Sequence, residues 1–171
     1  GSIARWLGSE RVVRAMPNTP ALVGQGMTGL YARPGVDAAD RALVAQLLAP
    51  TGELLWVDDE AALDAVTAIS GSGPAYVFYF IEAMTEAGVE MGLSSDQALR
   101  LAVGTFTGAS ALAHSATEPP SVLRERVTSK GGTTYAALTS LEGADVKAKF
   151  KTAIRAAQQR AAELGEEFGR A

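Results

Sequence analysis

The 171-residue sequence contains no cysteine, and this absence excludes several kinds of chemistry at once. Without thiols the chain has no disulfide, no thiolate nucleophile and no cysteine-based metal site. It also has a single histidine, His114, which lies inside a predicted helix with no partner identifiable from the sequence. We therefore expect neither a metal site nor a histidine-based nucleophilic centre.

A positive charge excess and a long apolar run are also missing. The 15 Lys and Arg residues against 19 Asp and Glu residues give a net charge of −4, so nucleic acid is not an expected partner. The longest strongly apolar run, residues 75–81, is far too short to span a membrane. No signal peptide is visible, and we expect a cytoplasmic location.

The character of the sequence changes near residue 58. Before it, short β-like runs at 11–16, 27–32 and 53–57 predict strands, with a helix over 38–49 between the last two. After it, the pattern is almost entirely helical. The predicted helices begin at 58 or 59 and run to 69, then cover 74–91, 94–116, 120–127, 134–142 and 145–168.

Local signals set several of these boundaries. Ser94 and Gln97 have capping-box spacing, and the segment Ser70–Pro74 is expected to break the chain before the next helix. The run from 98 to 113 carries one charge and is otherwise apolar or small all round. A helix of that kind belongs in a core or a subunit interface, and we favour an interface.

The segment Gly24–Gly29 matches the G-x-G-x-x-G pattern of dinucleotide-binding proteins. That fingerprint requires a strand before it and a helix opening at its last glycines. Here Asn18–Pro20 cuts the preceding segment short, and a β-like run follows the last glycine. We therefore expect these glycines to serve turns and strand packing.

The most informative segment is Val127–Leu138, in which Gly131 and Gly132 run directly into Thr133 and Thr134. A bare backbone turn at a helix N-terminus can hold a carboxylate through unpaired N–H groups and the helix dipole. An ordinary glycine loop with a threonine N-cap fits the same spacing. Because no acid–base machinery is visible elsewhere, the chemistry would come from a borrowed reagent such as a hydride-donating cofactor.

Three segments together resemble Δ1-pyrroline-5-carboxylate reductases: Val13–Pro20, Ile69–Tyr76 and Val127–Leu138, the last corresponding to the family signature. The resemblance covers essentially the whole chain. In this family an N-terminal Rossmann domain binds NADPH, and a helical domain similar to that of 6-phosphogluconate dehydrogenases interlocks with its twin. The family's own dinucleotide fingerprint is absent from this chain.

The resemblance therefore implies a mainly α fold: a 6-phosphogluconate dehydrogenase C-terminal-like helical dimerisation domain, preceded by the last strands of a truncated Rossmann domain. Residues 1–58 would be the remnant of the NADPH-binding domain. Residues 59–171 would form the helical dimerisation and substrate-binding domain.

The resemblance also implies roles for the residues of the glycine loop. Backbone amides of Gly132, Thr133 and Thr134 would bind the substrate carboxylate. The Thr134 hydroxyl would lie near the ring nitrogen, as the catalytic group, while Ser129 and Gly131 would shape the loop.

A second set of implied roles falls in the first part of the chain. Asn18, Thr19 and Pro20 would line the nicotinamide side of the pocket, and Gln25 would face the substrate. Arg126 stands where some members have Asn.

The implied reaction is reduction of the cyclic imine of 1-pyrroline-5-carboxylate to L-proline by NADPH or NADH, in a homodimer or a higher homo-oligomer such as a decamer. The alternative from another class is a non-catalytic helical dimerisation module. A dehydrogenase for β-hydroxyacids would use a catalytic lysine on a helix, which the loop around Lys130 does not resemble.

Because the cofactor fingerprint is absent, we expect the 171-residue chain to be inactive alone and not to bind NADPH measurably. Isothermal titration calorimetry checks this expectation. A micromolar dissociation constant would contradict it.

Overall fold

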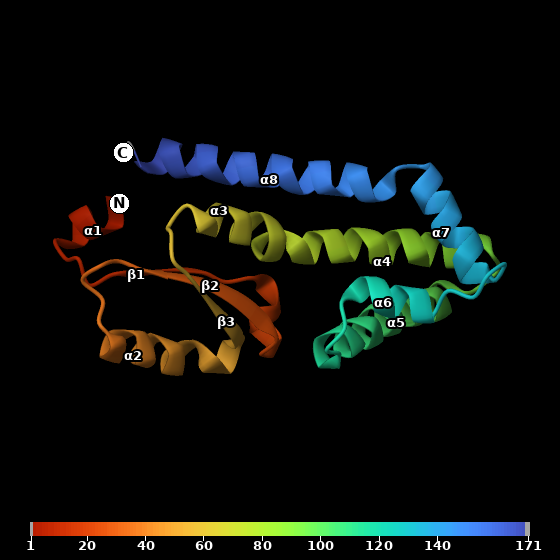
Figure 1. Ribbon diagram of the computed structural model, residues 1–171, viewed down its shortest axis with the longest axis horizontal. Coiled ribbons are helices and arrows are strands. Elements are labelled where there is room, and N and C mark those ends of the chain that lie inside the picture. The colour runs from red at the N-terminus through yellow and green to blue at the C-terminus, as the bar shows by residue number, and fades with distance from the viewer. Residues whose placement is uncertain (1, 170–171) are drawn as a thin grey trace. The chain divides into compact units, whose positions relative to one another are not determined.

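The computed structural model describes residues 2–169, which divide into two compact units (Figure 1). The first comprises the residues up to Pro74 together with those from Thr152 onward, and the second comprises Ala75–Lys151. Each unit is described by itself.

The first unit is built on a three-stranded mixed sheet in the order β1-β2-β3. The strands are β1 (Val13–Met16), β2 (Gly26–Ala32) and β3 (Gly52–Val57). The middle strand, β2, pairs antiparallel with β1 and parallel with β3. The three strands predicted from the sequence are therefore confirmed.

The core of this unit lies on β2, where Thr28 and Leu30 are almost fully buried. On one face, a side chain at Gly29 would collide with Val66 and contact Leu63, so α3 (Ala62–Val66) packs directly on the backbone. Helix α2 (Ala38–Leu48) covers the opposite face (Figure 1). Burial on both faces explains why β2 reads as a small and apolar run.

Around the sheet lie the short α1 (Ser2–Leu7), two 3-10 turns (Thr19–Val23 and Ala49–Thr51) and a π-helical turn (Thr67–Gly71). The predicted break within Ser70–Pro74 is confirmed but is shorter than expected, because the chain stays helical through Gly71 and α4 begins at Gly73. The Thr67 and Ser70 hydroxyls donate to the carbonyls of Leu63 and Val66, at 2.7 and 3.1 Å. Such bonds to a carbonyl four residues back keep the chain helical while bending it.

Helices make up the second unit, as the sequence predicts. They are α4 (Gly73–Glu90), α5 (Ser95–Ser115), α6 (Pro120–Arg126), α7 (Thr133–Gly143) and α8 (Val146–Gly169), of which α4 begins and α8 ends in the first unit.

The capping box at the start of α5 is confirmed, and an aromatic cluster packs the inner face of the second unit. The Ser94 N–H donates to Gln97 Oε1 at 3.0 Å, and the Gln97 N–H donates to Ser94 Oγ at 3.3 Å.

Phe150 of α8 meets Tyr76 and Phe80 of α4 edge to face, with ring centroids 5.6 Å apart in both pairs. These edge-to-face contacts fix the register between α4 and the start of α8.

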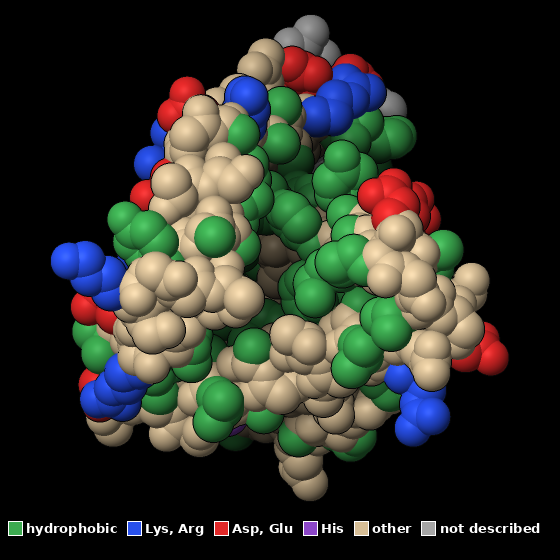
Figure 2. All heavy atoms as spheres, turned by 90° about the vertical axis from the view of Figure 1, so that its right-hand side faces the viewer, with side chains coloured by type: hydrophobic (Ala, Val, Ile, Leu, Met, Phe, Trp, Pro, Cys, Tyr) green, Lys and Arg blue, Asp and Glu red, His purple; other side chains and the backbone are tan. Residues whose placement is uncertain are grey.

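The helices of the second unit leave much apolar surface uncovered. Among the described residues, Gly88 and the two α5 alanines Ala98 and Ala102 are buried. Large apolar side chains stay exposed on α4, α5 and α7, including Phe78, Tyr79, Met84, Leu101, Leu112 and Tyr135. Hydrophobic side chains are correspondingly prominent on the face drawn in Figure 2. This is the surface expected of an interface helix.

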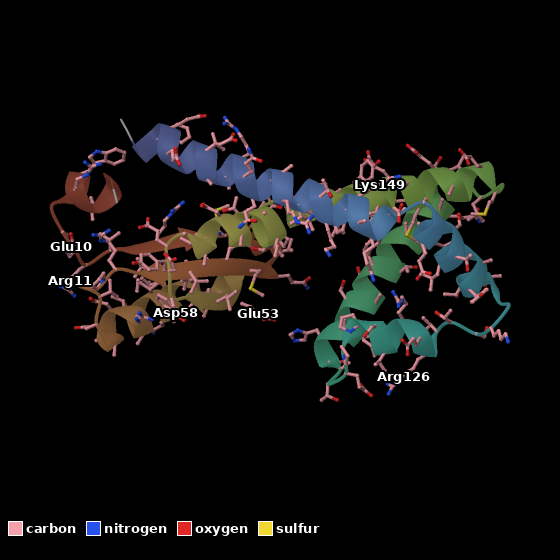
Figure 3. The ribbon with its side chains drawn as sticks, turned by 45° about the horizontal axis from the view of Figure 1, so that its top comes forward. Glu10, Arg11, Glu53, Asp58, Arg126 and Lys149 are labelled. Carbon is pink, nitrogen blue, oxygen red and sulfur yellow. The ribbon has the colours of Figure 1, made fainter. Side chains whose placement is uncertain are left out.

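Two ion pairs lie at the edge of the first unit near the beginning of β1, where Figure 3 labels Glu10 and Arg11. Arg11 Nε donates to Asp40 at 3.0 Å, and Arg33 Nε donates to Glu10 at 2.7 Å. The hydrogen bonds from Arg11 lower the pKa of the Asp40 carboxyl. Within the described residues, we find no helix that is both long and apolar enough to span a bilayer.

One glycine is indispensable to the sheet. Gly52 has φ +131°, and an added Cβ would collide with the Gly26 backbone. We therefore expect Gly52→Ala to lower the free energy of unfolding by about 2–4 kcal/mol, measured by urea denaturation.

Gly165 supplies the matched control, because the space around its Cβ position in α8 is open. The same substitution there should raise stability by about 0.5–1 kcal/mol, the usual gain of alanine over glycine in a helix. Equal effects at the two positions would contradict the packing described for Gly52.

Candidate functional site

The glycine loop connects α6 to α7 and is tied down at its base. The Thr128 hydroxyl donates to the Arg124 carbonyl at 2.6 Å, and the Thr128 N–H donates to the Glu125 carbonyl at 3.0 Å. Arg126, labelled in Figure 3 near the end of α6, pairs with Glu118. The loop therefore leaves α6 in a defined direction.

A tight turn follows, and it depends on both glycines. Gly131 has φ +74°, a left-handed conformation that glycine adopts without steric cost. The Gly132 N–H donates to the Ser129 carbonyl at 3.0 Å and closes the turn. A Cβ on Gly132 would lie 2.5 Å from Ser129 Oγ and 3.2 Å from Ser129 O. Gly132 is thus packed against Ser129, while Gly131 supplies the left-handed conformation of the turn.

Helix α7 begins without a side-chain cap. Its N-cap is Gly132, with φ −80° and ψ 177°, and no side chain bonds the first turn. The alternative of a threonine N-cap is therefore wrong, because both threonines have already entered the helix. The first N–H groups of an α-helix have no partner within the helix. At α7 these belong to Thr133 and Tyr135, which are exposed, and to Thr134, which is half-buried; the N–H of Ala136 is the first to bond within the helix, to the Gly132 carbonyl.

The electrostatic environment at the start of α7 favours the binding of an anion. The first turn of α7 contains no acidic residue, and the exposed Lys130 lies in the preceding loop. The positive end of the helix dipole adds to that charge. A helix start of this kind can hold a small anion, such as a carboxylate or a phosphate.

The other predicted site residues lie in the first unit, where β1 ends. The Asn18 amide bridges two elements: its Nδ2 donates to the Ser70 carbonyl at 3.1 Å, and its Oδ1 accepts from the Met27 N–H at 2.9 Å. Thr19 and Pro20 open the 3-10 turn that follows. Gln25 is exposed, and its N–H donates to the Pro20 carbonyl at 3.1 Å.

The predicted site residues thus form two groups, each compact. Ser129, Gly131, Gly132, Thr133 and Thr134 come together at the start of α7, in the second unit. Asn18, Thr19, Pro20 and Gln25 come together beside the start of β2, in the first unit.

Sequence reasoning missed the residues that hold Asn18. The π-helical turn supplies the Ser70 carbonyl, and a Cβ at Gly71 would lie 2.8 Å from Met16 Cε at the end of β1. The Ser-Gly-Ser-Gly-Pro run belongs to a segment of the family resemblance, but its pattern gave no reason to place it against residue 18. That contact joins residues 52 positions apart.

The pattern Gly24–Gly29 is confirmed as strand packing. Gly26 and Gly29 lie within β2, and an added Cβ at Gly26 would meet Ala21 and the Thr51 carbonyl. His114 lies in the last turn of α5. Between residues 2 and 169, the structure contains no cluster of three or more His, Asp or Glu side chains that could hold a metal ion.

Comparison with known proteins assigns the family. The model for the pyrroline-5-carboxylate reductase dimerisation domain matches residues 60–164, which include all of α4 to α7 and most of α8. The chain belongs to the pyrroline-5-carboxylate reductase family. The predicted fold class is confirmed as well: a mainly helical dimerisation domain preceded by a small three-stranded mixed sheet.

Relatives match along nearly the whole chain. A pyrroline-5-carboxylate reductase from Pseudomonas aeruginosa is 52% identical over 169 residues, covering 98% of this chain and 62% of the relative. One from Arabidopsis thaliana is 42% identical, covering 96% and 59%. This chain therefore spans about three fifths of the length of these curated relatives.

Solved structures agree with the fold. The pyrroline-5-carboxylate reductase of Coxiella burnetii superposes with a TM-score of 0.91 at 41% identity, covering 95% of this chain and 60% of that one. The Plasmodium falciparum enzyme, solved with NADP bound, has a TM-score of 0.87 at 34% identity, covering 95% and 66%.

The close fit of Gly132 against Ser129 can be measured by a double-mutant cycle. We expect Gly132→Ala to destabilise the chain by about 1–2 kcal/mol, because the new methyl group forces Ser129 to move. Adding Ser129→Ala removes the Oγ, and should return about half of that loss. Urea denaturation of the four proteins gives the coupling, and strict additivity would contradict the described turn.

Proposed function

We propose that this chain supplies the substrate loop and the dimerisation helices of a pyrroline-5-carboxylate reductase, which reduces the cyclic imine of 1-pyrroline-5-carboxylate to L-proline in proline biosynthesis. The observation that carries the proposal is the uncapped N-terminus of α7 at Gly132 within a chain of this family. The substrate is a small ring that carries a carboxylate and an imine. Its binding needs an anion site for the carboxylate and a hydrogen-bonding group for the nitrogen, no farther apart than the width of the ring.

The carboxylate would bind the start of α7. The backbone N–H groups of Thr133 and Thr134 are among the donors left by helix geometry, while the Gly132 N–H is engaged with the Ser129 carbonyl. Gly132 contributes by having no side chain, and Gly131 by its left-handed turn. Ser129 shapes the loop by closing that turn.

Thr134 would act at the ring nitrogen. Its hydroxyl can donate or accept a hydrogen bond, and its half-buried position shelters that bond from water. Attack of hydride on the ring carbon next to nitrogen needs no strong protein base, so the protein's task is to hold the ring in place.

The cofactor would be NADPH or NADH, which supplies the hydride when bound. Residues Asn18–Pro20 fit the edge of a cofactor site but do not form a complete site. The amide of Asn18 is hydrogen-bonded within the protein, and Thr19 is exposed. Gln25, also exposed, would face the substrate. We assign residues 1–58 to the cofactor-binding domain, which lies mainly outside this chain.

The partner surface would be the exposed apolar faces of α4 and α5. Side chains such as Phe78 and Leu101 cover them, and around Gly104 and Gly108 the surface is open to close approach. A second copy of the chain would bury these faces, giving a homodimer or a higher oligomer.

The test uses the complete gene product, assayed by oxidation of NADPH in the presence of 1-pyrroline-5-carboxylate. We expect Thr134→Ala to lower kcat/KM by the equivalent of about 1–3 kcal/mol, the cost of an unmade buried hydrogen bond. Thr134→Ser, which keeps the hydroxyl, should retain most of the activity.

Two results would count against the proposal. Absence of proline formation by the wild-type protein would refute the function, and unchanged steady-state kinetics in Thr134→Ala would remove Thr134 from the mechanism.

A further inference from the structure

Asn18 is the only asparagine in the chain, and both ends of its half-buried amide are hydrogen-bonded within the protein. The amide oxygen accepts from the Met27 N–H at 2.9 Å, while the amide nitrogen donates to the Ser70 carbonyl at 3.1 Å. Only one orientation of the amide satisfies both partners, because the Met27 N–H is a donor and the Ser70 carbonyl an acceptor. The site therefore requires a donor and an acceptor on one planar group.

The position of Asn18 explains why this group is needed. Strand β1 ends at Met16, opposite Gly29, and continuing the same antiparallel register would bring residue 18 opposite Met27. The chain instead turns away after Pro17 into the 3-10 turn Thr19–Val23. The Asn18 side chain takes over the hydrogen bond that the backbone of a longer β1 would have made.

The second bond of the amide reaches a different element. Ser70 lies in the π-helical turn, the neighbour Gly71 leaves no space for a Cβ against Met16, and the turn runs almost directly into α4. One side chain thus links the end of β1, the start of β2 and the π-helical turn. Turns of this kind are frequent at functional sites.

We infer that Asn18 is a positioning residue: its amide locks the segment Thr19–Pro20 and the π-helical turn into one arrangement, instead of contacting the cofactor itself. This inference rests on the proposed function, in which Thr19 and Pro20 line the nicotinamide side. Pre-organised contacts of this sort raise the affinity for the cofactor and align the cofactor with the substrate.

The substitution Asn18→Asp keeps the shape of the side chain and changes only its hydrogen-bonding chemistry. The introduced carboxyl is nearly isosteric, and in its neutral form it offers the same donor and acceptor. In its charged form it accepts the Met27 N–H but faces the Ser70 carbonyl with a second acceptor. The facing acceptor at Ser70 and the partial burial favour the neutral form and outweigh the opposing bond from the Met27 N–H, so we expect the pKa of the carboxyl in the folded protein to lie above its unfolded value. The two bonded partners, Met27 and Ser70, carry no titratable group.

The sign of the pH effect follows from that shift. The stabilising neutral form is fully present below the unfolded pKa and is lost as pH rises through the folded pKa. The wild-type protein has no titratable group at this position. The stability of Asn18→Asp should therefore approach that of wild type in acid and fall below it in base. Asn18→Ala removes both bonds at every pH and should show no such convergence.

The experiment compares the complete gene product with its Asn18→Asp and Asn18→Ala variants between pH 5.5 and pH 8. At pH 8 both variants should have kcat/KM for NADPH lowered by about tenfold, largely through KM. At pH 5.5 the deficit of Asn18→Asp should be smaller than at pH 8, while the deficit of Asn18→Ala stays the same. Gln46→Glu, the same amide-to-carboxyl change at an exposed position of α2, is the control and should match wild type throughout.

Melting temperatures of the same proteins give an arm that does not depend on the reaction. The Asn18→Asp midpoint should lie about 3 °C or more below wild type at pH 8, and the gap should close in acid. Full activity of Asn18→Asp at pH 8, or a deficit of equal size at both pH values, would overturn the inference. If wild type reduces no 1-pyrroline-5-carboxylate, the proposed function fails, and convergence of the midpoints still decides whether the amide holds the two segments together.

Discussion

The second unit has more apolar surface than its own helices can bury, and this constraint shapes the molecule. Its buried residues are small, such as Gly88 and Ala98, whereas Phe78, Tyr79 and Leu101 stay exposed. Small residues let helices approach closely but contribute little hydrophobic stabilisation. The remaining driving force must come from covering the outer faces, which agrees with the match of residues 60–164 to a dimerisation domain.

In the proposed function, the candidate substrate loop would work with little side-chain chemistry. Gly131 turns the chain, Gly132 caps α7 without a side chain, and the helix start keeps its own N–H groups available. Backbone donors are fixed by the helix and cannot change rotamer, so they bind an anion without a loss of side-chain entropy. For the hydride transfer proposed for this chain, such positioning would be sufficient.

Much of the architecture could be predicted from the sequence, because local signals agree with the tertiary structure. The three strand runs, the capping box at Ser94 and the helix boundaries from α4 to α8 all lie close to their expected places. The segment Ser70–Pro74 was the exception. Its glycines and proline predict a break over five residues, but the hydroxyls of Thr67 and Ser70 bond to the preceding helical turns, and the π-helical turn continues to Gly71 and leaves the break at Ser72.

The sequence by itself determined the class of the protein: the absence of cysteine and of a basic excess removed whole kinds of chemistry, and three segments carried the family resemblance. Only the tertiary structure decided what Asn18 does and which residue caps α7. The amide of Asn18 bonds Ser70, 52 positions away, and hydrogen bonds across such separations leave no periodic trace in a sequence. Whether Gly132 or a threonine starts the helix depends on backbone angles, which two adjacent glycines leave unusually free.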